Sequence, residues 1–312
     1  MTVAVGLGFM DFPFSSADAY WRWVEMCEEG GVDSVWQTDR LVSEQPFLEC
    51  MSAMAALAGA TKRLKFGMNV VSVGLRDPLL LAKQCATIDM LSNGRLLPGF
   101  GIGNIRAADW QATGADTEGR GRRSNEALEI IARLWVEDSV DFDGEFYQYR
   151  NAMISPKPVQ KELPMWLGGA SKLAIRRTAR YGTGWQAGLE TPDEVAPVIA
   201  AIKQALVEEG RTIDFDHYGG AFSYRFGAWE DRPVQATAAF FRDSLARAPE
   251  PRIVTGGAAE ILQRIEAFIA AGASKFILSP IGAGDDEIFF QTERLIGELL
   301  PEIAKFNPPQ DS

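Results

Sequence analysis

The chain has 312 residues, 46% of them hydrophobic, and its formal net charge is −11 at pH 7. This length and apolar content suffice for one large core, and no linker-like or low-complexity segment divides the sequence, so we expect a single domain over residues 1–312. The acidity argues against a nucleic-acid partner, because the negative surface would repel phosphates.

The positions of cysteine and histidine and the lengths of the apolar segments argue against disulfides, metal sites and membrane spans. Cys27, Cys50 and Cys85 match neither a disulfide framework nor the spacing of zinc ligands, and the only histidine, His217, falls in a polar linker. We therefore expect no metal site and leave His217 out of the candidate site. The chain does not open with a basic stretch followed by a long apolar run, and no apolar segment is long enough to span a bilayer. These features predict a cytoplasmic protein with no membrane partner.

The sequence alternates between strand-like and helix-like segments. The expected strands cover residues 3–9, 33–36, 64–70, 95–100, 165–167, 184–187, 219–228 and 275–278. The expected helices cover residues 18–30, 46–60, 78–91, 122–135, 172–181, 194–209, 234–246, 258–271 and 286–304. Apolar residues at helical spacing mark the first helix, and Asp77 followed by Pro78 is typical of a helix start. A hairpin is expected over 140–149, turning at Asp143-Gly144.

Eight strand–helix units in strict alternation predict an α/β fold, a (β/α)8 TIM-like barrel with its ligand at the carboxyl ends of the strands. The alternative is a doubly wound open sheet, which is less favoured because no GxGxxG motif opens the helix after the first strand. The polar, glycine-rich stretch over 101–121 is too long for an ordinary loop and indicates a functional or mobile segment after the fourth strand.

Short motifs recur where the expected strands end. They are Trp-Gln-Thr-Asp-Arg at 36–40, Gly-Met-Asn-Val at 67–70, Gly-Phe-Gly-Ile-Gly-Asn at 99–104 and Trp-Leu-Gly-Gly-Ala-Ser at 166–171. In their order and spacing, together with residues 76–95, 120–134, 154–158 and 182–185, they resemble the bacterial luciferase-like family of flavin- and deazaflavin-dependent oxidoreductases. The resemblance covers nearly the whole chain. It implies a TIM-like barrel with an insertion after strand four, a homodimer, and FMN or the deazaflavin coenzyme F420 at the barrel mouth.

The resemblance places the cofactor phosphate at Gly168, Gly169, Ala170 and Ser171, where a strand ends and a helix begins. Backbone N–H groups at a helix start lack intrahelical partners, the helix dipole favours an anion, and glycine lets a phosphate approach closely. Ser171 would add a hydroxyl donor and Arg176 a positive charge. The alternative is a tight turn with Ser171 as a helix N-cap.

Asn69 and Val70 end the third expected strand. The resemblance implies a bulge with a non-proline cis peptide here, behind the isoalloxazine ring, with Asn69 donating a hydrogen bond to the polar edge of that ring. The alternative is an asparagine that caps a turn at the strand end.

Asp39 and Arg40 end the second expected strand and are the candidate catalytic residues. Many deazaflavin-dependent relatives have Asp followed by His here, whereas Arg40 stays protonated and cannot shuttle protons. Asn104, a candidate cofactor ligand, falls where some of those relatives carry glutamate. Both departures argue against the hypothesis that the chain is an F420-dependent alcohol dehydrogenase, because alcohol oxidation needs a base. The alternative for Asp39 and Arg40 is a surface ion pair.

Arg76, Arg106 and Arg225 fall near the carboxyl ends of the third, fourth and seventh expected strands. Their convergence at one mouth would suggest an anionic ligand or a stabilised reduced-flavin anion.

The resemblance favours an FMN-dependent monooxygenase that acts on a small organic substrate with reduced flavin from a separate reductase, and with residues 101–121 as a lid. One alternative is hydride transfer with F420, whose oligoglutamate tail would need basic residues such as Lys172, Arg176 and Arg177. Another is a flavin-binding protein without turnover.

Overall fold

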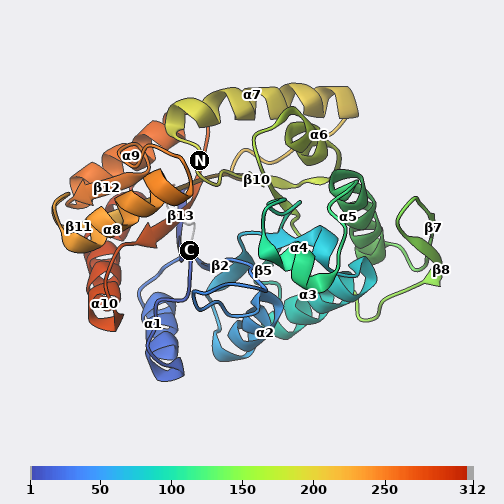
Figure 1. The fold of residues 1–312 in the computed structure, drawn as a ribbon, viewed down its shortest axis with the longest axis horizontal. Coiled ribbons are helices and arrows are strands. Elements are labelled where there is room, and N and C mark those ends of the chain that lie inside the picture. Colours follow the sequence, from blue (N-terminus) through green and yellow to red (C-terminus); the bar gives the residue numbers. More distant parts are fainter. Residues whose placement is uncertain (1, 308–312) are drawn as a thin grey trace.

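A ring of parallel strands forms the centre of the computed structural model, which describes residues 2–307 (Figure 1). Parallel pairings run from β1 through every barrel position and return to β1 through β13, so the barrel is closed. The eight barrel positions are β1 (Ala4–Gly8), β2 (Ser34–Gln37), β3 (Lys65–Met68) with β4 (Val71–Ser72), β5 (Leu96–Leu97) with β6 (Gly99–Gly101), β9 (Trp166–Gly168), β10 (Gly184–Gln186), β11 (Tyr218–Phe226) and β13 (Lys275–Pro280). The predicted barrel and all eight of its strands are confirmed.

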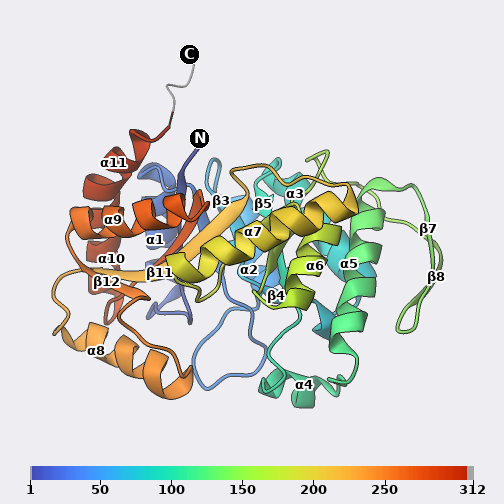
Figure 2. The same ribbon diagram turned by 90° about the horizontal axis from the view of Figure 1, so that it is seen from above.

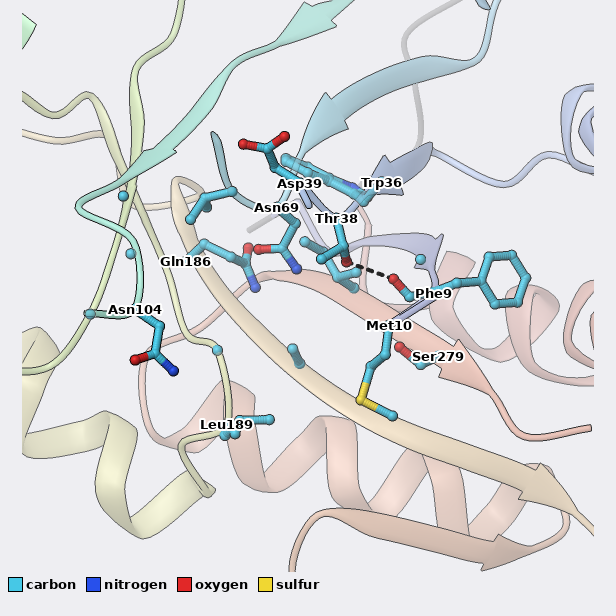
Figure 3. Close-up of a pocket in the computed structure, with 18 of the residues that line it drawn as sticks. Phe9, Met10, Trp36, Thr38, Asp39, Asn69, Asn104, Gln186, Leu189 and Ser279 are labelled. Carbon is cyan, nitrogen blue, oxygen red and sulfur yellow. Dashed lines mark hydrogen bonds between the residues drawn. The ribbon is translucent and has the colours of Figure 1, made fainter. Parts of the chain in front are cut away.

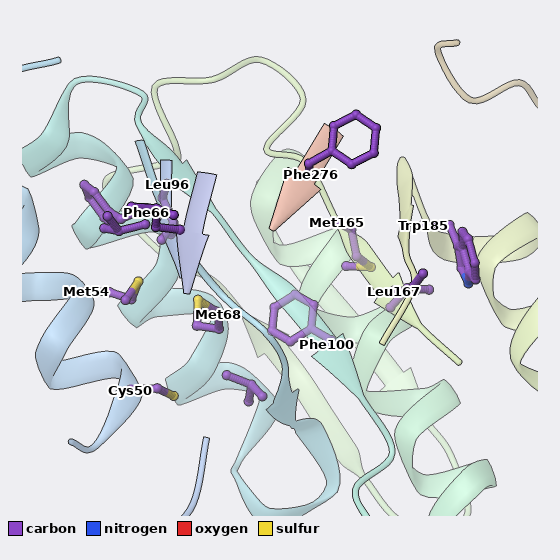
Figure 4. Packing of buried hydrophobic residues seen from close by; sticks show 14 of the residues in the cluster. Cys50, Met54, Phe66, Met68, Leu96, Phe100, Met165, Leu167, Trp185 and Phe276 are labelled. Atoms are coloured by element: carbon purple, nitrogen blue, oxygen red, sulfur yellow. The ribbon is translucent and has the colours of Figure 1, made fainter. Parts of the chain in front are cut away.

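Strands of such a barrel are covered on both faces, so they are rich in large apolar residues. Phe66, Phe100 and Phe276 are fully buried between the barrel and its helices, as is Trp185 (Figure 4). This core holds the strand ends in fixed positions and therefore fixes the place of any side chain just beyond them.

Helices follow the strands in turn and cover the outside of the barrel (Figure 1). They are α1 (Ala17–Glu29), α2 (Cys50–Ala60), α3 (Pro78–Ser92), α5 (Arg120–Val136), α6 (Lys172–Tyr181), α7 (Pro192–Glu209), α9 (Ala258–Ala270) and α10 (Asp285–Arg294), the last continuing through a π-helical turn (Leu295–Leu299) into α11 (Leu300–Ala304). The Asp77 side chain caps α3 by accepting from the backbone N–H of Leu80 at 2.9 Å, as its position before Pro78 predicts. None of the helices in the described part of the chain has the length and apolarity needed to cross a membrane.

The segment between β6 and β9 is enlarged. It contains α5 and an antiparallel hairpin, β7 (Val140–Asp143) with β8 (Gln148–Ala152), which projects from one side of the barrel (Figure 2). It also contains a short helix, α4 (Ala108–Thr113), within the stretch that the sequence marked only as polar and glycine-rich. Trp110 of α4 is 3% exposed and donates from Nε1 to the backbone oxygen of Asn104 at 2.9 Å, so a buried side chain anchors this stretch.

The seventh unit also differs from the expectation. The helix predicted over 234–246 is α8 (Arg232–Ala239) followed by a π-helical turn (Phe240–Ser244). An additional strand, β12 (Ile253–Gly256), then pairs with the carboxyl-terminal part of β11. In the view of Figure 2, α4 and α8 lie on the same side of the molecule.

Candidate functional site

A cavity of about 490 Å³ lies where the barrel strands end. Every barrel position contributes to its lining, which places the cavity at the end of the barrel where ligands bind in this architecture. One residue from each position is Gly8, Trp36, Asn69, Gly101, Gly168, Gln186, Ser223 and Ser279. Phe9, Met10 and Leu189 add apolar surface, and Figure 3 shows Met10 extending toward the cavity.

Two side-chain amides line the cavity from barrel positions that are not neighbours. Asn69 follows β3 and Gln186 ends β10, and both are drawn in Figure 3. Gln186 is 2% exposed and donates from Nε2 to the backbone oxygens of Ala187 at 3.1 Å and Gly220 at 3.3 Å. Its Oε1 is buried without a partner within residues 2–307. Because an unsatisfied buried acceptor is costly, this atom fits a ligand that brings an N–H donor, as the isoalloxazine and deazaflavin rings do.

The backbone beside Asn69 has the predicted irregularity. The Asn69–Val70 peptide bond is cis, and it separates β3 from β4. Val70 lines the cavity together with Asn69.

Asp39 lines the cavity, but both of its carboxylate oxygens are engaged. Arg76 donates from Nη1 to Oδ2 at 2.7 Å and from Nη2 to Oδ1 at 2.8 Å, and the backbone N–H of Ser72 donates to Oδ2 at 3.1 Å. Arg76 also contacts Glu49 at 3.0 Å. Burial by itself lowers the pKa of Arg76, but hydrogen bonds and charges from Asp39 and Glu49 outweigh burial and hold it above its ordinary value. The Arg76 guanidinium therefore binds both oxygens of the Asp39 carboxylate.

Arg40 is placed differently from its neighbour. It is half-buried, lines the cavity, and forms no ion pair or side-chain hydrogen bond within the described residues. The other lining arginine, Arg252, is 7% exposed and bonds Glu194 at 2.8 Å and the backbone oxygen of Leu189 at 2.7 Å. Arg40 is thus the lining cation whose charge the surrounding side chains do not neutralise.

The glycine turn after β9 lies at the cavity edge. Gly168 and Gly169 line the cavity, and Gly169 has a φ of +104°, a conformation that favours glycine. Trp185 donates from Nε1 to the Gly169 backbone oxygen at 3.0 Å and so fixes the turn. Ala170 and Ser171 follow toward α6, where the Ser171 hydroxyl caps the helix by accepting from the backbone N–H of Ala174 at 3.2 Å. The capping interpretation of Ser171 is therefore realised, and its hydroxyl hydrogen remains available to donate.

The remaining residues that the sequence predicted for the site do not gather in this cavity. Arg176 lies not in this cavity but in a separate groove between α5 and α6. Asn104 is an exposed lining residue whose Oδ1 accepts from the Arg106 backbone N–H at 3.0 Å. Arg225 pairs with Asp231 at 2.7 Å and Glu287 at 2.9 Å. Arg76, Arg106 and Arg225 therefore do not converge on the cavity.

Sequence reasoning missed several polar residues that line the cavity. They are Thr38, Ser72, Gln186, Ser223, Arg252 and Ser279. Position alone could have indicated Gln186, because it ends a predicted strand and such residues face the mouth of a barrel. Arg252 had no such signal, since it precedes the unpredicted strand β12.

Comparison with known proteins identifies the family of this chain and relatives of most of its length. Residues 13–271 match the model of a family described as luciferase-like monooxygenase. An uncharacterized protein of Mycobacterium tuberculosis (strain ATCC 25618 / H37Rv) is 35% identical over 173 residues, which is 55% of this chain and 59% of that protein, so this match leaves about two fifths of that relative's length uncovered. An F420-dependent glucose-6-phosphate dehydrogenase of Amycolatopsis mediterranei (strain U-32) is 26% identical, covering 88% of this chain and 91% of the relative.

Solved structures share the fold. An F420-dependent secondary alcohol dehydrogenase in complex with an F420–acetone adduct gives a TM-score of 0.83 at 19% identity, over 97% of this chain and 99% of that chain. The oxygenating constituent of 3,6-diketocamphane monooxygenase from Pseudomonas putida, in complex with FMN, gives 0.78 at 16% identity, over 97% and 99% of the two chains. Solved structures that hold F420 or FMN therefore share this fold.

Proposed function

Because the chain belongs to the luciferase-like monooxygenase family, we propose that its cavity binds FMN and that the protein is a flavin-dependent monooxygenase of a small organic substrate. Reduced FMN, supplied by a separate reductase, would bring the reactivity toward dioxygen. The chain would bind and orient the flavin and exclude water.

One observation carries this proposal: the cavity lining contains no histidine, cysteine, lysine or glutamate, and its one carboxylate is paired with an arginine. The titratable groups of the lining are Asp39, Arg40 and Arg252. Asp39 is held by Arg76, and arginine does not deprotonate in proteins. A reaction that needs a protein base, such as alcohol oxidation, finds no imidazole and no unpaired carboxylate here, whereas chemistry supplied by the cofactor needs only a shaped site.

The residues around the cavity suit the parts of a flavin. The unpartnered Oε1 of Gln186 would accept from the ring N–H, and the Asn69 amide would bond the polar edge of the ring. The Gly168–Ser171 turn and the start of α6 would hold the phosphate, because the first amides of a helix are free donors. Arg40 would place a fixed positive charge beside the reduced ring or the substrate.

A second candidate function is hydride transfer with F420 in the direction of reduction. The favouring observation is that arginines gather in the groove between α5 and α6, where a cofactor with several carboxylates would find counter-charges. F420-dependent proteins also stand among the relatives.

Titration of the purified protein with FMN and with F420, each oxidised and reduced, tests both functions. We expect a shift of the cofactor absorbance on binding, and dioxygen consumption with reduced FMN in the presence of a substrate. The Gln186→Leu variant, which removes the unpartnered acceptor, should bind the ring about tenfold more weakly. If neither cofactor binds the wild-type protein, the proposal is wrong.

A further inference from the structure

A second hollow, of about 540 Å³, lies between α5 and α6 and gathers five arginines in a protein of net charge −11. They are Arg120, Arg122, Arg176, Arg177 and Arg180. We call this hollow the arginine groove. Helices α5 and α6 lie side by side in Figure 2, so side chains from both reach it. Like charges converge in this way at a cost unless a ligand neutralises them.

The carboxylates near the groove do not neutralise all five arginines. Arg122 pairs with Glu145 at 3.0 Å, and Arg180 pairs with Glu129 at 3.7 Å. Glu209 is the one carboxylate residue in the lining of the groove. Arg120, Arg176 and Arg177 form no ion pair within residues 2–307.

The three arginines without a carboxylate partner have different surroundings. Arg177 donates from Nε to the Asn125 side-chain oxygen at 2.7 Å, and burial lowers the pKa of its guanidinium. By contrast, carboxylates raise the pKa of Arg76 above its ordinary value despite burial. The Nε of Arg120 is buried without any hydrogen-bond partner in the described chain. Arg176 is exposed and makes no side-chain hydrogen bond there. The groove therefore contains guanidinium donors that no group among residues 2–307 accepts from.

The groove adjoins the cofactor cavity. Ile102, directly after β6, lines both hollows, and α6 begins at the phosphate turn and carries Arg176, Arg177 and Arg180. Arg176 and Arg180 are one turn apart, which places their side chains about 6 Å from each other along one face of α6. Anionic groups spaced along a flexible chain would match this row, whereas the single phosphate of FMN would occupy the glycine turn in the function proposed above.

We propose that the arginine groove is a binding site for an oligo-anion, a chain of two or more carboxylates or phosphates. The inference rests on the proposed function only for its connection to the cofactor cavity. The oligo-anion has two possible sources: the carboxylate tail of a deazaflavin cofactor seated in the cavity, or a free polyanion bound beside FMN.

The test uses Arg176→Gln and the double variant Arg120→Gln/Arg176→Gln, with Arg150→Gln as the matched control. Arg150 is exposed on the remote hairpin and pairs there with Asp143, so its loss changes the net charge equally without touching the groove. The single variant removes an exposed side chain without partners, so it folds even if the double variant does not, and thermal melting checks both.

Calorimetric titration with tripolyphosphate and with tri-glutamate should show salt-sensitive binding to the wild-type protein that the groove variants weaken about tenfold and the control does not. If the groove binds the cofactor tail, the affinity for F420 falls in the groove variants, while the affinity for 8-hydroxy-5-deazariboflavin, which lacks phosphate and tail, stays constant. If the groove binds a free polyanion, only the affinities for the two probes fall.

The inference is wrong if the wild-type protein binds neither probe and binds F420 no more tightly than the tail-free deazaflavin. It is also wrong if the wild type and the groove variants have equal affinities. A wrong inference about the groove can be told apart from a wrong proposed function. If the proposed function is wrong, the wild-type protein binds neither FMN nor the tail-free deazaflavin, and both are titrated separately from the polyanion probes.

Discussion

The side chain of Gln186 in β10 fills the space above Gly219, its register partner on the adjacent strand β11. A Cβ on Gly219 would lie 1.9 Å from Gln186 Oε1. Because Gly219 has no side chain, the Gln186 amide has room to occupy its place in the cavity wall.

Gly219→Ala should consequently weaken cofactor binding about tenfold, because the new methyl displaces the Gln186 amide. It should also lower the free energy of unfolding by about 1–3 kcal/mol through overpacking. Cofactor titration and urea unfolding measure the two effects. Gly59→Ala in α2 is the control, since a Cβ there meets nothing within 4 Å. Unaltered affinity in Gly219→Ala would mean that Gln186 does not contact the ring.

Asp39→Asn should lower the free energy of unfolding by about 3 kcal/mol, because it leaves the buried guanidinium of Arg76 with only the half-exposed Glu49 as a counter-charge. Urea unfolding measures the loss. Glu145→Gln breaks an ion pair between exposed side chains and should cost less than about 1 kcal/mol. Equal small effects in both variants would show that Asp39 does not depend on Arg76.

Arg40→Lys should reduce turnover about tenfold although the charge is kept, because the planar fork of donors is lost. Arg40→His should weaken reduced-flavin binding as well, because a neutral imidazole offers fewer donors at pH 7. Turnover and reduced-cofactor affinity are the measurements, with Arg106→Lys, an exposed arginine outside the cavity lining, as the control. Unchanged values in both Arg40 variants would remove Arg40 from the site.

Gly169→Asp should abolish cofactor binding, because its carboxylate would repel a phosphate at the glycine turn. The φ of +104° adds a cost of about 1–3 kcal/mol for any side chain there. Gly169→Ala carries that backbone cost without the charge, and its Cβ would lie 3.1 Å from that of Ala174. Affinity lost only in the aspartate variant supports the phosphate site, whereas equal affinities would place the phosphate elsewhere.

Asp33 should make stability depend on pH at the end of the barrel remote from the cavity. It contacts Lys275 at 2.5 Å and Lys65 at 3.1 Å. Burial alone raises the pKa of Asp33, but the two ammonium groups outweigh burial and hold it well below its ordinary range. A depressed folded-state pKa contributes stability that is present above the unfolded value of about 3.9 and is lost as the pH falls below it.

The stability difference between wild type and Asp33→Asn, measured by urea unfolding, should therefore be about 3 kcal/mol or more at pH 6 and should shrink as the pH falls from about 4 toward 2. A difference that stays constant across that range would show that Asp33 is not ionised in the folded protein.

The strands and helices could be predicted because each depends on local patterns. Asp77 and Pro78 show where α3 begins, and the apolar runs of the strands mark the buried barrel. β12 was missed because its four residues form a strand only through pairing with Ser223–Phe226 of β11. α4 was missed because its anchor, Trp110, is buried by tertiary contacts and not by a repeating pattern.

The site was predictable in position but not in its charge pairing. Asn69, Gly168 and Gly169 line the cavity because strand ends must face the barrel mouth. Asp39 and Arg76 are 37 residues apart, and nothing in the sequence shows that they meet. Their pairing leaves Asp39 bound on both oxygens by Arg76, and Arg40 has no carboxylate partner among the described residues.

The barrel closes only when its last strand, β13, pairs with its first, β1. Ile277 and Ser279, which line the cavity, arrive with that last strand. A chain that ends before residue 280 consequently lacks one wall of the cavity. A ligand that uses this wall would stabilise the closed ring over the open one, so binding and docking of the final strand are coupled.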